Sequence, residues 1–292
     1  MPDDLDLLVV GSIALDRRDG PFGKVDEELG GSAVYFALAA SLVLPVKVSA
    51  PVGKDAIETV SKVFDGHDID MSRVKVFGAP TYRWTAHQEH GRTVDLGSAD
   101  EIYDHWQPEL PEGFAGWAFV GSMRPDRQVA AITALRHPAR LLAADAMLSY
   151  VRLQPDEAVD VLRRSSWFFC NHEEYLAFGA GDPEEFRRRW FLDGLVLKSG
   201  AAGVTAYTAN GEVQIPGLRG HPHSIPSEPA TRWPEGCSRD GCAQGGARPG
   251  CRTRWCAASP AHRLRSSRSE CAASRRPRRN SSIIGWARYG KA

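Results

Sequence analysis

The sequence predicts an α/β fold in which a mostly parallel sheet is covered by helices on both faces. Apolar, strand-like runs alternate with helical patterns over residues 1–220, and this alternation is typical of parallel sheets. The chain has 292 residues, enough for one large α/β domain or two modest ones. No internal repeat interrupts the pattern.

The expected elements follow one another in the order strand, helix. In the first half we expect a buried strand over 5–16, a helix over 30–44, a strand over 46–53 and a helix over 54–67. In the second half we expect strands that begin the segments 116–122, 139–147, 165–175 and 192–203, and helices over 124–137 and 155–164. The helix 155–164 has acids in its first turn and arginines in its last, which suits the helix dipole.

Two segments depart from this alternation. Residues 18–31 and 78–98 mix polar and β-prone residues around glycines, and the second predicts a hairpin-like flap that stands off the main sheet. Ligands bind at the carboxyl ends of strands in parallel sheets. Flaps near that edge are therefore candidates for a lid that excludes water.

The last part of the chain differs sharply in composition from the rest. Residues 221–292 contain 14 basic and 4 acidic residues, whereas residues 1–220 contain 22 basic and 32 acidic residues. In this tail the only Ile, Leu, Val, Met or Phe residues are Ile225, Leu264, Ile283 and Ile284. Burial of so few apolar groups cannot offset the loss of chain entropy on folding. We therefore place a domain boundary at about 216–224.

Several observations argue against membrane insertion and export. The N-terminus lacks the pattern of a signal peptide, and the longest apolar run, "AVYFALAASLVL", is too short to cross a bilayer. Cys170 is the only cysteine before the tail, so nothing there indicates an oxidising compartment. We expect a cytoplasmic protein with no membrane or nucleic-acid partner.

The first candidate binding residues are Asp16 and the glycine pair Gly30 and Gly31. Asp16 ends the expected first strand, where a carboxylate can accept hydrogen bonds from two vicinal hydroxyls of a sugar; it could equally cap a turn. The two glycines precede a helix that starts with Ser32, which would let a ligand approach free backbone N–H groups. A tight turn would need the same glycines.

A second group of candidates follows two later strands. Asn171 and Glu174 share a face at the start of an expected helix, where they could organise magnesium-bound water around phosphates; the simpler interpretation is a helix N-cap. Lys198 could face a phosphate, and Gly200 and Gly203 could let a nucleotide lie against the backbone. This segment lacks the P-loop spacing and could also be a hairpin connection.

Together these segments resemble the ribokinase-like (PfkB-type) carbohydrate kinases over roughly residues 5–216. The motifs that carry the resemblance occur in the family's order: "GSIALD", "GGSAVYFALAASLVLPVKVSAPVGKD", "APTYRW", "NHEE" and "LVLKSGAAGV". The resemblance implies a three-layer α/β sandwich with a small β lid. It also implies transfer of the γ-phosphoryl group of Mg-ATP to a sugar hydroxyl, and a homodimer joined through the lid.

The resemblance also implies roles for particular residues. Asp16, Gly31, Ser32 and, from the lid, Arg83 would bind the sugar. Asn171 and Glu174 would lie near ATP and Mg²⁺, and neither is assigned as a direct ligand of the metal. Lys198, Gly200 and Gly203 would lie along the nucleotide. Tyr35 stands where many members have Asn, which hints at a different substrate.

The family's most diagnostic motif is missing. In the family, a motif that follows the strand corresponding to "GEVQIP" reads Asp-Thr/Pro-x-Gly-x-Gly-Asp-x-x-x-Gly-Gly. The N–H groups of its glycines form an anion hole, and its second Asp is the catalytic base. "SIPSEPATRWPEGCS", residues Ser224 to Ser238, stands there instead. One choice of synonymous codons for this segment, read from the third base of the first codon, encodes Asp-Pro-Val-Gly-Thr-Gly-Asp-Ala-Val-Ala-Gly-Gly. We therefore interpret residues 221–292 as a frameshifted end.

The tail leaves two other interpretations open. Cys237, Cys242, Cys251 and Cys256 could hold zinc, although their spacing is not the usual one, and the arginines could bind nucleic acid. For the whole chain we expect a sugar kinase by descent whose activity is doubtful as written. The alternatives are a nucleoside kinase and a non-catalytic sugar-binding remnant.

Overall fold

The computed structural model describes residues 6–20, 23–89, 92–135 and 141–217. The chain divides into two units, Met1–Trp233 and Pro234–Ala292. All described residues belong to the first unit, so the whole of the second unit lies outside them.

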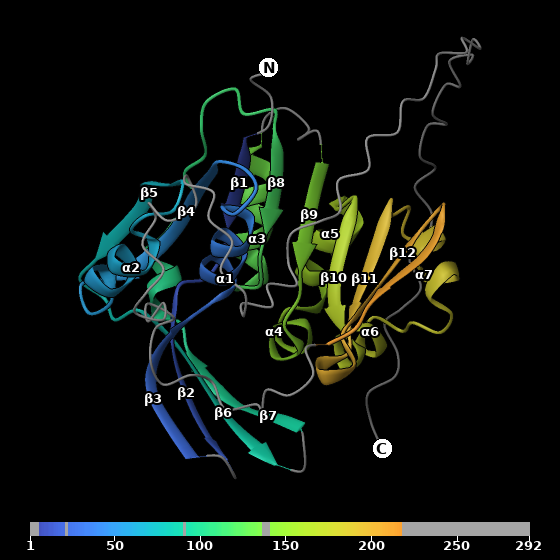
Figure 1. Ribbon diagram of the computed structural model, residues 1–292, viewed down its shortest axis with the longest axis horizontal. Helices are drawn as coiled ribbons and strands as arrows, with labels where there is room; N and C mark the ends of the chain where they lie inside the picture. The colour runs from blue at the N-terminus through green and yellow to red at the C-terminus, as the bar shows by residue number, and fades with distance from the viewer. Residues whose placement is uncertain (1–5, 21–22, 90–91, 136–140, 218–292) are drawn as a thin grey trace, which may run out of the picture. The chain divides into compact units, whose positions relative to one another are not determined.

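Within the described residues a nine-stranded sheet has the strand order β13-β12-β11-β10-β9-β8-β1-β4-β5 (Figure 1). Its strands are β1 (Leu7–Val10), β4 (Val46–Gly53), β5 (Ile69–Phe77), β8 (Trp117–Val120), β9 (Leu141–Asp145), β10 (Trp167–Asn171), β11 (Gly194–Lys198), β12 (Val204–Thr208) and β13 (Gly211–Ile215). Neighbouring strands run parallel from β5 to β11, and β12 and β13 continue the sheet as antiparallel strands. The predicted α/β class and the mostly parallel sheet are confirmed.

Helices cover the sheet on both faces, which makes the predicted sandwich. They are α1 (Ser32–Ala40), α2 (Ile57–Phe64), α3 (Pro125–Ala134), α4 (Leu148–Leu153), α5 (Pro155–Arg164), α6 (His172–Ala177) and α7 (Pro183–Arg189), with the short 3₁₀ helices η1 (Glu101–Asp104) and η2 (Gly200–Ala202). One core cluster joins the sheet to α1 and α2, and another joins it to α3 through α7. No helix in the described part of the chain is long and apolar enough to cross a membrane.

A second sheet forms the lid. In the described part of the chain it has four strands in the order β3-β2-β6-β7, drawn in the lower part of Figure 1. The strands are β2 (Ala14–Gly20), β3 (Gly23–Gly30), β6 (Tyr82–Glu89) and β7 (Arg92–Ala99). β2 pairs with β3 and β6 with β7 as antiparallel hairpins, and parallel pairing of β2 with β6 joins the hairpins. Both segments that were expected to stand off the main sheet therefore belong to this second sheet.

One expected strand is divided in two. The prediction of a single strand over 5–16 is wrong, because β1 ends at Val10 and β2 starts at Ala14. The chain turns where the start of α1 packs closely: a Cβ at Gly11 would lie 2.7 Å from Ser32 Oγ. Asp16 consequently belongs to a lid strand and does not end a strand of the large sheet.

The elements that were not expected from the sequence include the strand β5 and the helices α4 and α7. β5 is an edge strand, and its residues alternate between exposed and partly buried. Its sequence, "IDMSRVKVF", therefore lacks the continuous apolar run that marks a central parallel strand. α4 and α7 have only six and seven residues, too few to show a helical period clearly.

Candidate active site

A cavity of about 880 Å³ lies between the lid and the carboxyl ends of the central strands. Its walls come from the lid, the start of α1 and the strand ends of β9 to β11. Residues predicted to bind a ligand that line it are Asp16, Gly31, Ser32, Tyr35, Asn171, Glu174 and Lys198. The structure thus gathers seven predicted residues from distant parts of the sequence around one cavity.

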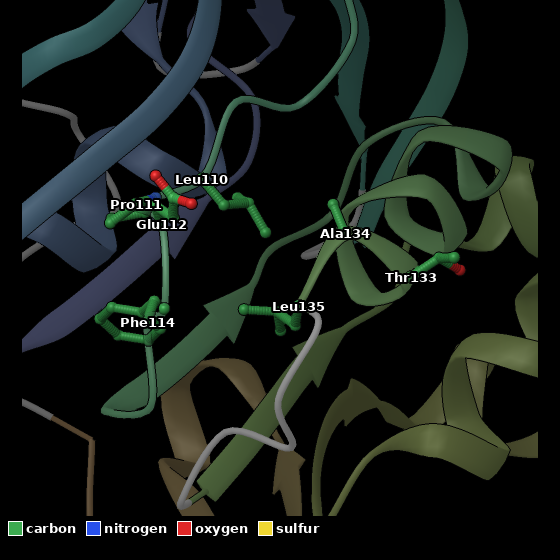
Figure 2. Close-up of a pocket in the computed structure, with 8 residues that line it drawn as sticks. Leu110, Pro111, Glu112, Phe114, Thr133, Ala134 and Leu135 are labelled. Atoms are coloured by element: carbon green, nitrogen blue, oxygen red, sulfur yellow. The ribbon is translucent and has the colours of Figure 1, made fainter.

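Another hollow, of about 510 Å³, lies at the C-terminal end of α3. Figure 2 shows Leu110, Phe114 and Leu135 among its lining side chains. Among the described residues that line it, Glu112 is the one carboxylate, and none is a predicted site residue. The larger cavity is therefore the candidate active site.

Asp16 is a buried carboxylate at the lid end of the cavity. It is only 7% exposed, and it lies beside Trp84 in the parallel register of β2 and β6. Burial raises the pKa of Asp16 to about 6; the charge of Arg18 opposes this rise and that of Glu28 adds to it. A carboxylate held in this way can accept hydrogen bonds from ligand hydroxyl groups.

The two glycines before α1 are needed for different reasons. A Cβ at Gly30 would overlap the carboxylate of Asp16, so Gly30 leaves the space that this group occupies. Gly31 has φ +102°, and a Cβ there would overlap the backbone carbonyl of Ser12. The expectation of a tight turn holds, and the same glycines line or shape the cavity.

The polar atoms of Ser32 are engaged within the protein. Its Oγ accepts from Ser12 N at 3.2 Å and donates to the carbonyl of Ser122 at 3.0 Å. Its backbone N–H donates to Ser12 Oγ at 2.9 Å. Ser32 therefore joins the start of α1 to two other segments, the β1–β2 turn and the loop after β8. It still borders the cavity.

Tyr35 and Trp84 place aromatic surface near Asp16. Tyr35 is 55% exposed, and burial together with the charges of Asp16 and Glu28 raises the pKa of its hydroxyl. Trp84 lines the cavity from the lid, and its indole N–H is buried without a hydrogen-bond partner among the described residues. The sequence offered no signal for Trp84 beyond its place in the flap.

Arg83 connects the lid to the large sheet's loops and does not line the cavity. Its guanidinium donates to Asp55 Oδ2 at 2.8 Å, Glu27 Oε1 at 3.2 Å and the carbonyl of Thr81 at 2.9 Å. Glu27 belongs to β3 and has φ +60°, unusual for a residue other than glycine. Arg83 thus bridges a strained lid residue and the loop after β4.

Asn171 and Glu174 form a capping box at the start of α6. Asn171 Oδ1 accepts from Glu174 N at 2.9 Å, and Glu174 Oε2 accepts from Asn171 N at 2.7 Å. The N-cap interpretation is confirmed, and both residues also line the cavity. Burial raises the pKa of Glu174 to about 7, against the lowering effect of Lys198. Glu174 is only 5% exposed.

Lys198 has a partner that the sequence did not indicate. Its Nζ lies 2.6 Å from Asp145 Oδ1, and Asp145 ends β9 and lines the cavity. Burial would lower the pKa of Lys198, but the charges of Asp145 and Glu174 raise it above its usual value. Burial raises the pKa of Asp145, with Lys198 opposing. Asp145 could have been found as an acid at a strand's carboxyl end.

Gly200 and Gly203 are not among the residues that line the cavity. Both have positive φ, +55° and +98°, and a Cβ at Gly203 would overlap the carbonyl of Ile215 in β13. The segment connects β11 to its antiparallel neighbour β12, so the alternative interpretation as a hairpin connection is confirmed.

Comparison with known proteins finds this architecture among solved kinase structures. No protein-family model matches the sequence, and no curated protein does. Among solved structures, the nucleoside kinase of Methanocaldococcus jannaschii, described as an archaeal ribokinase-family member, is similar with TM-score 0.56 and 16% identity; 72% of this chain and 76% of that one are covered.

Two bacterial structures give the same result. Burkholderia thailandensis nucleoside kinase with inosine has TM-score 0.58 and 17% identity, over 73% of this chain and 76% of that one. A double mutant of Vibrio cholerae fructokinase with fructose, ADP and potassium bound has TM-score 0.55 and 18% identity, over 74% and 77%. The chain therefore has the fold of the ribokinase-family kinases.

Proposed function

We propose that this chain derives from an ATP-dependent kinase that transfers the γ-phosphoryl group of Mg-ATP to a sugar hydroxyl. One observation carries the proposal: a single cavity holds a buried carboxylate, Asp16, on its lid side and an ammonium group, Lys198, at the strand ends. A hydroxyl-bearing acceptor suits the first group and a phosphate suits the second.

At the acceptor end, Asp16 would accept hydrogen bonds from two hydroxyls, and Gly31 would allow close approach to the backbone. Tyr35 would contact the acceptor from α1. Arg83 would act on the acceptor through the lid, because it contacts Asp55 and Glu27. Lid closure would then exclude water from the reacting groups.

At the phosphate end, Lys198 would bind phosphate oxygens, with Asn171 and Glu174 nearby. The side-chain oxygens of Asn171 and Glu174 fit Mg²⁺, which favours oxygen ligands and usually binds through few carboxylates together with substrate phosphates and water. The ion would neutralise charge on the phosphates. Gly200 and Gly203 would support the nucleotide by shaping the turn after β11.

The catalytic base and the anion hole have no counterpart in the sequence as written. Their place falls at Ser224 to Ser238, outside the described residues. We propose that residues 1–220 are the kinase domain and that residues 221–292 result from a lost base. The chain as written would then be a scaffold with negligible activity, since loss of a general base costs about 10²–10⁴ in rate and one anion-hole donor about 10²–10³.

The test compares two proteins, the chain as written with its mass verified and a version with one base restored between the codons for Val213 and Ser238. ATP-dependent phosphorylation of a panel of sugars and nucleosides is measured for both. Activity in the restored version alone supports the proposal. Activity of the chain as written at the same rate would overturn the assignment of the missing motif.

A nucleoside acceptor is the second candidate, favoured by the aromatic side chains Trp84 and Tyr35 near Asp16. A non-catalytic sugar-binding remnant is the third. Thermal-shift measurements distinguish a kinase from a non-catalytic remnant. Nucleotide and acceptor together should stabilise a kinase, whereas sugar alone should suffice to stabilise a remnant. Saturation about 100-fold above Kd contributes about 2.7 kcal/mol.

We also propose a cytoplasmic protein whose partners are a small acceptor and ATP, without nucleic acid or membrane. A homodimer through the lid is part of the proposal, because β7 is an edge strand of the lid that exposes Val94 and Leu96. The molar mass in solution, measured by light scattering, tests it: a monomer at all concentrations would overturn the dimer.

A further inference from the structure

The phosphate end of the cavity combines one ammonium group, Lys198, with a buried carboxylate, Glu174, and a largely buried one, Asp145. Lys198 Nζ contacts Asp145 Oδ1 at 2.6 Å, and the charge of Glu174 also acts on Lys198. The Asp145 side chain is 15% exposed and that of Lys198 is 37% exposed, so the ammonium is the more accessible of the two. Asp145 lies outside the sequence motifs that resemble the ribokinase-like kinases.

Backbone groups fix both carboxylates in place. Asp145 Oδ1 also accepts from Ala146 N at 2.9 Å, and its carbonyl accepts from the buried side chain of Gln128 at 2.9 Å. Glu174 accepts from Asn171 N in the capping box. If either carboxylate turned away from the cavity, Asp145 would lose its bond from Ala146 N and Glu174 its bond from Asn171 N.

This arrangement determines the local charge. With both carboxylates ionised, Asp145, Glu174 and Lys198 together carry one net negative charge. The other charged groups that line this part of the cavity are Arg152 and Glu173. Arg152 and Glu173 are both exposed, so water and salt screen their charges more than those of Asp145 and Glu174.

Repulsion by such a cluster depends on the charge of the ligand. Free ATP carries more negative charge than its magnesium complex, and the interaction of each charge with Asp145 is strong where water is excluded. We propose that Asp145 is a specificity-determining residue, which makes the cavity bind ATP as its magnesium complex in preference to free ATP. This inference rests on the proposed nucleotide site.

The test is a binding measurement that needs no catalysis. Isothermal titration calorimetry on the full chain at pH 8.5 gives Kd for ATP with EDTA and for ATP with excess MgCl₂. The ratio of Kd with EDTA to Kd with excess MgCl₂ should be large for the wild type. Asp145→Asn, which keeps the shape and the hydrogen-bond acceptor, should reduce this ratio roughly tenfold or more. Lys198→Met should weaken binding in both conditions.

Matched variants separate the possible causes. Glu173→Gln removes the same charge from the same cavity wall but from an exposed side chain, and it should change the ratio little. Glu174→Gln should reduce the ratio as Asp145→Asn does, which keeps the test valid if Asp145→Asn fails to fold by circular dichroism.

Two results would overturn the inference alone: an unchanged ratio in Asp145→Asn and Glu174→Gln, or an equal reduction in Glu173→Gln. If the wild type binds no ATP in either condition, the proposed nucleotide site fails and the inference fails with it. The two kinds of failure are therefore distinguishable.

Discussion

Gly30 and Asp16 lie on the two strands of the first lid hairpin, and the carboxylate of Asp16 fills the space where a side chain at position 30 would begin. The burial of this carboxylate therefore depends on a missing Cβ on the neighbouring strand. The acceptor end of the cavity is shaped by what Gly30 lacks as well as by what Asp16 supplies.

Gly30→Ala is expected to displace the Asp16 carboxylate and to weaken acceptor binding. The added methyl group would overlap Asp16, and Gly30 has no positive φ that would add backbone strain. Thermal shifts with the acceptor that stabilises the wild type measure the effect. Gly66→Ala is the control, because Gly66 has φ +78° but open space around its Cβ position. Gly66→Ala should cost about 1–2 kcal/mol of stability without affecting binding. Equal binding by wild type and Gly30→Ala would contradict the expectation.

Asp16 should make the stability of the protein depend on pH with a definite sign. Its pKa is about 6 in the folded protein against an ordinary value of 3.8, so the folded state binds more protons between these values. The free energy of unfolding should therefore fall as pH rises from about 4 to 6, by up to about 3 kcal/mol from this group. Asp16→Asn should flatten this fall, as urea unfolding at a series of pH values can measure. Glu174 adds a similar fall up to about pH 7, which Glu174→Gln removes separately.

Removal of the Arg83 guanidinium should loosen the lid. Arg83 contacts both Asp55, in the loop after β4, and Glu27, in the lid. Arg83→Met should raise the rate of amide hydrogen exchange in β6 and β2, because the lid loses its tie to the large sheet. Arg17→Met is the matched control, since Arg17 contacts Glu27 and Asp26 within the lid only. Similar exchange rates in both variants would show that the contact with Asp55 does not hold the lid.

Side chains at strand ends could be predicted from the sequence, whereas their partners could not. Asn171 and Lys198 each end a strand, and a parallel sheet brings such ends to one edge. The pair Lys198–Asp145 depends on the order β9-β10-β11, and this order is a property of the tertiary fold. The contact between Ser12 and Ser32 likewise depends on how α1 packs against the turn after β1. For the same reason the division of the first strand could not be predicted from its continuous apolar character.

The last prediction concerns the far edge of the large sheet. Val213 and Ile215 of β13 are each 59% exposed, and they pair with Ala206 and Val204 of β12. They therefore lie on the face opposite to Tyr207, which packs in the core with α7 residue Phe186. Tail residues 221–292 contain only four Ile, Leu, Val, Met or Phe residues, too few to cover this face. Restoring one base between the codons for Val213 and Ser238 should supply apolar segments that cover it. The restored protein should bind less of the dye ANS and unfold at higher urea concentration than the chain as written. Val213→Thr should reduce ANS binding by the chain as written but have no such effect after restoration. Equal dye binding and equal stability of the two proteins would contradict the frameshift interpretation.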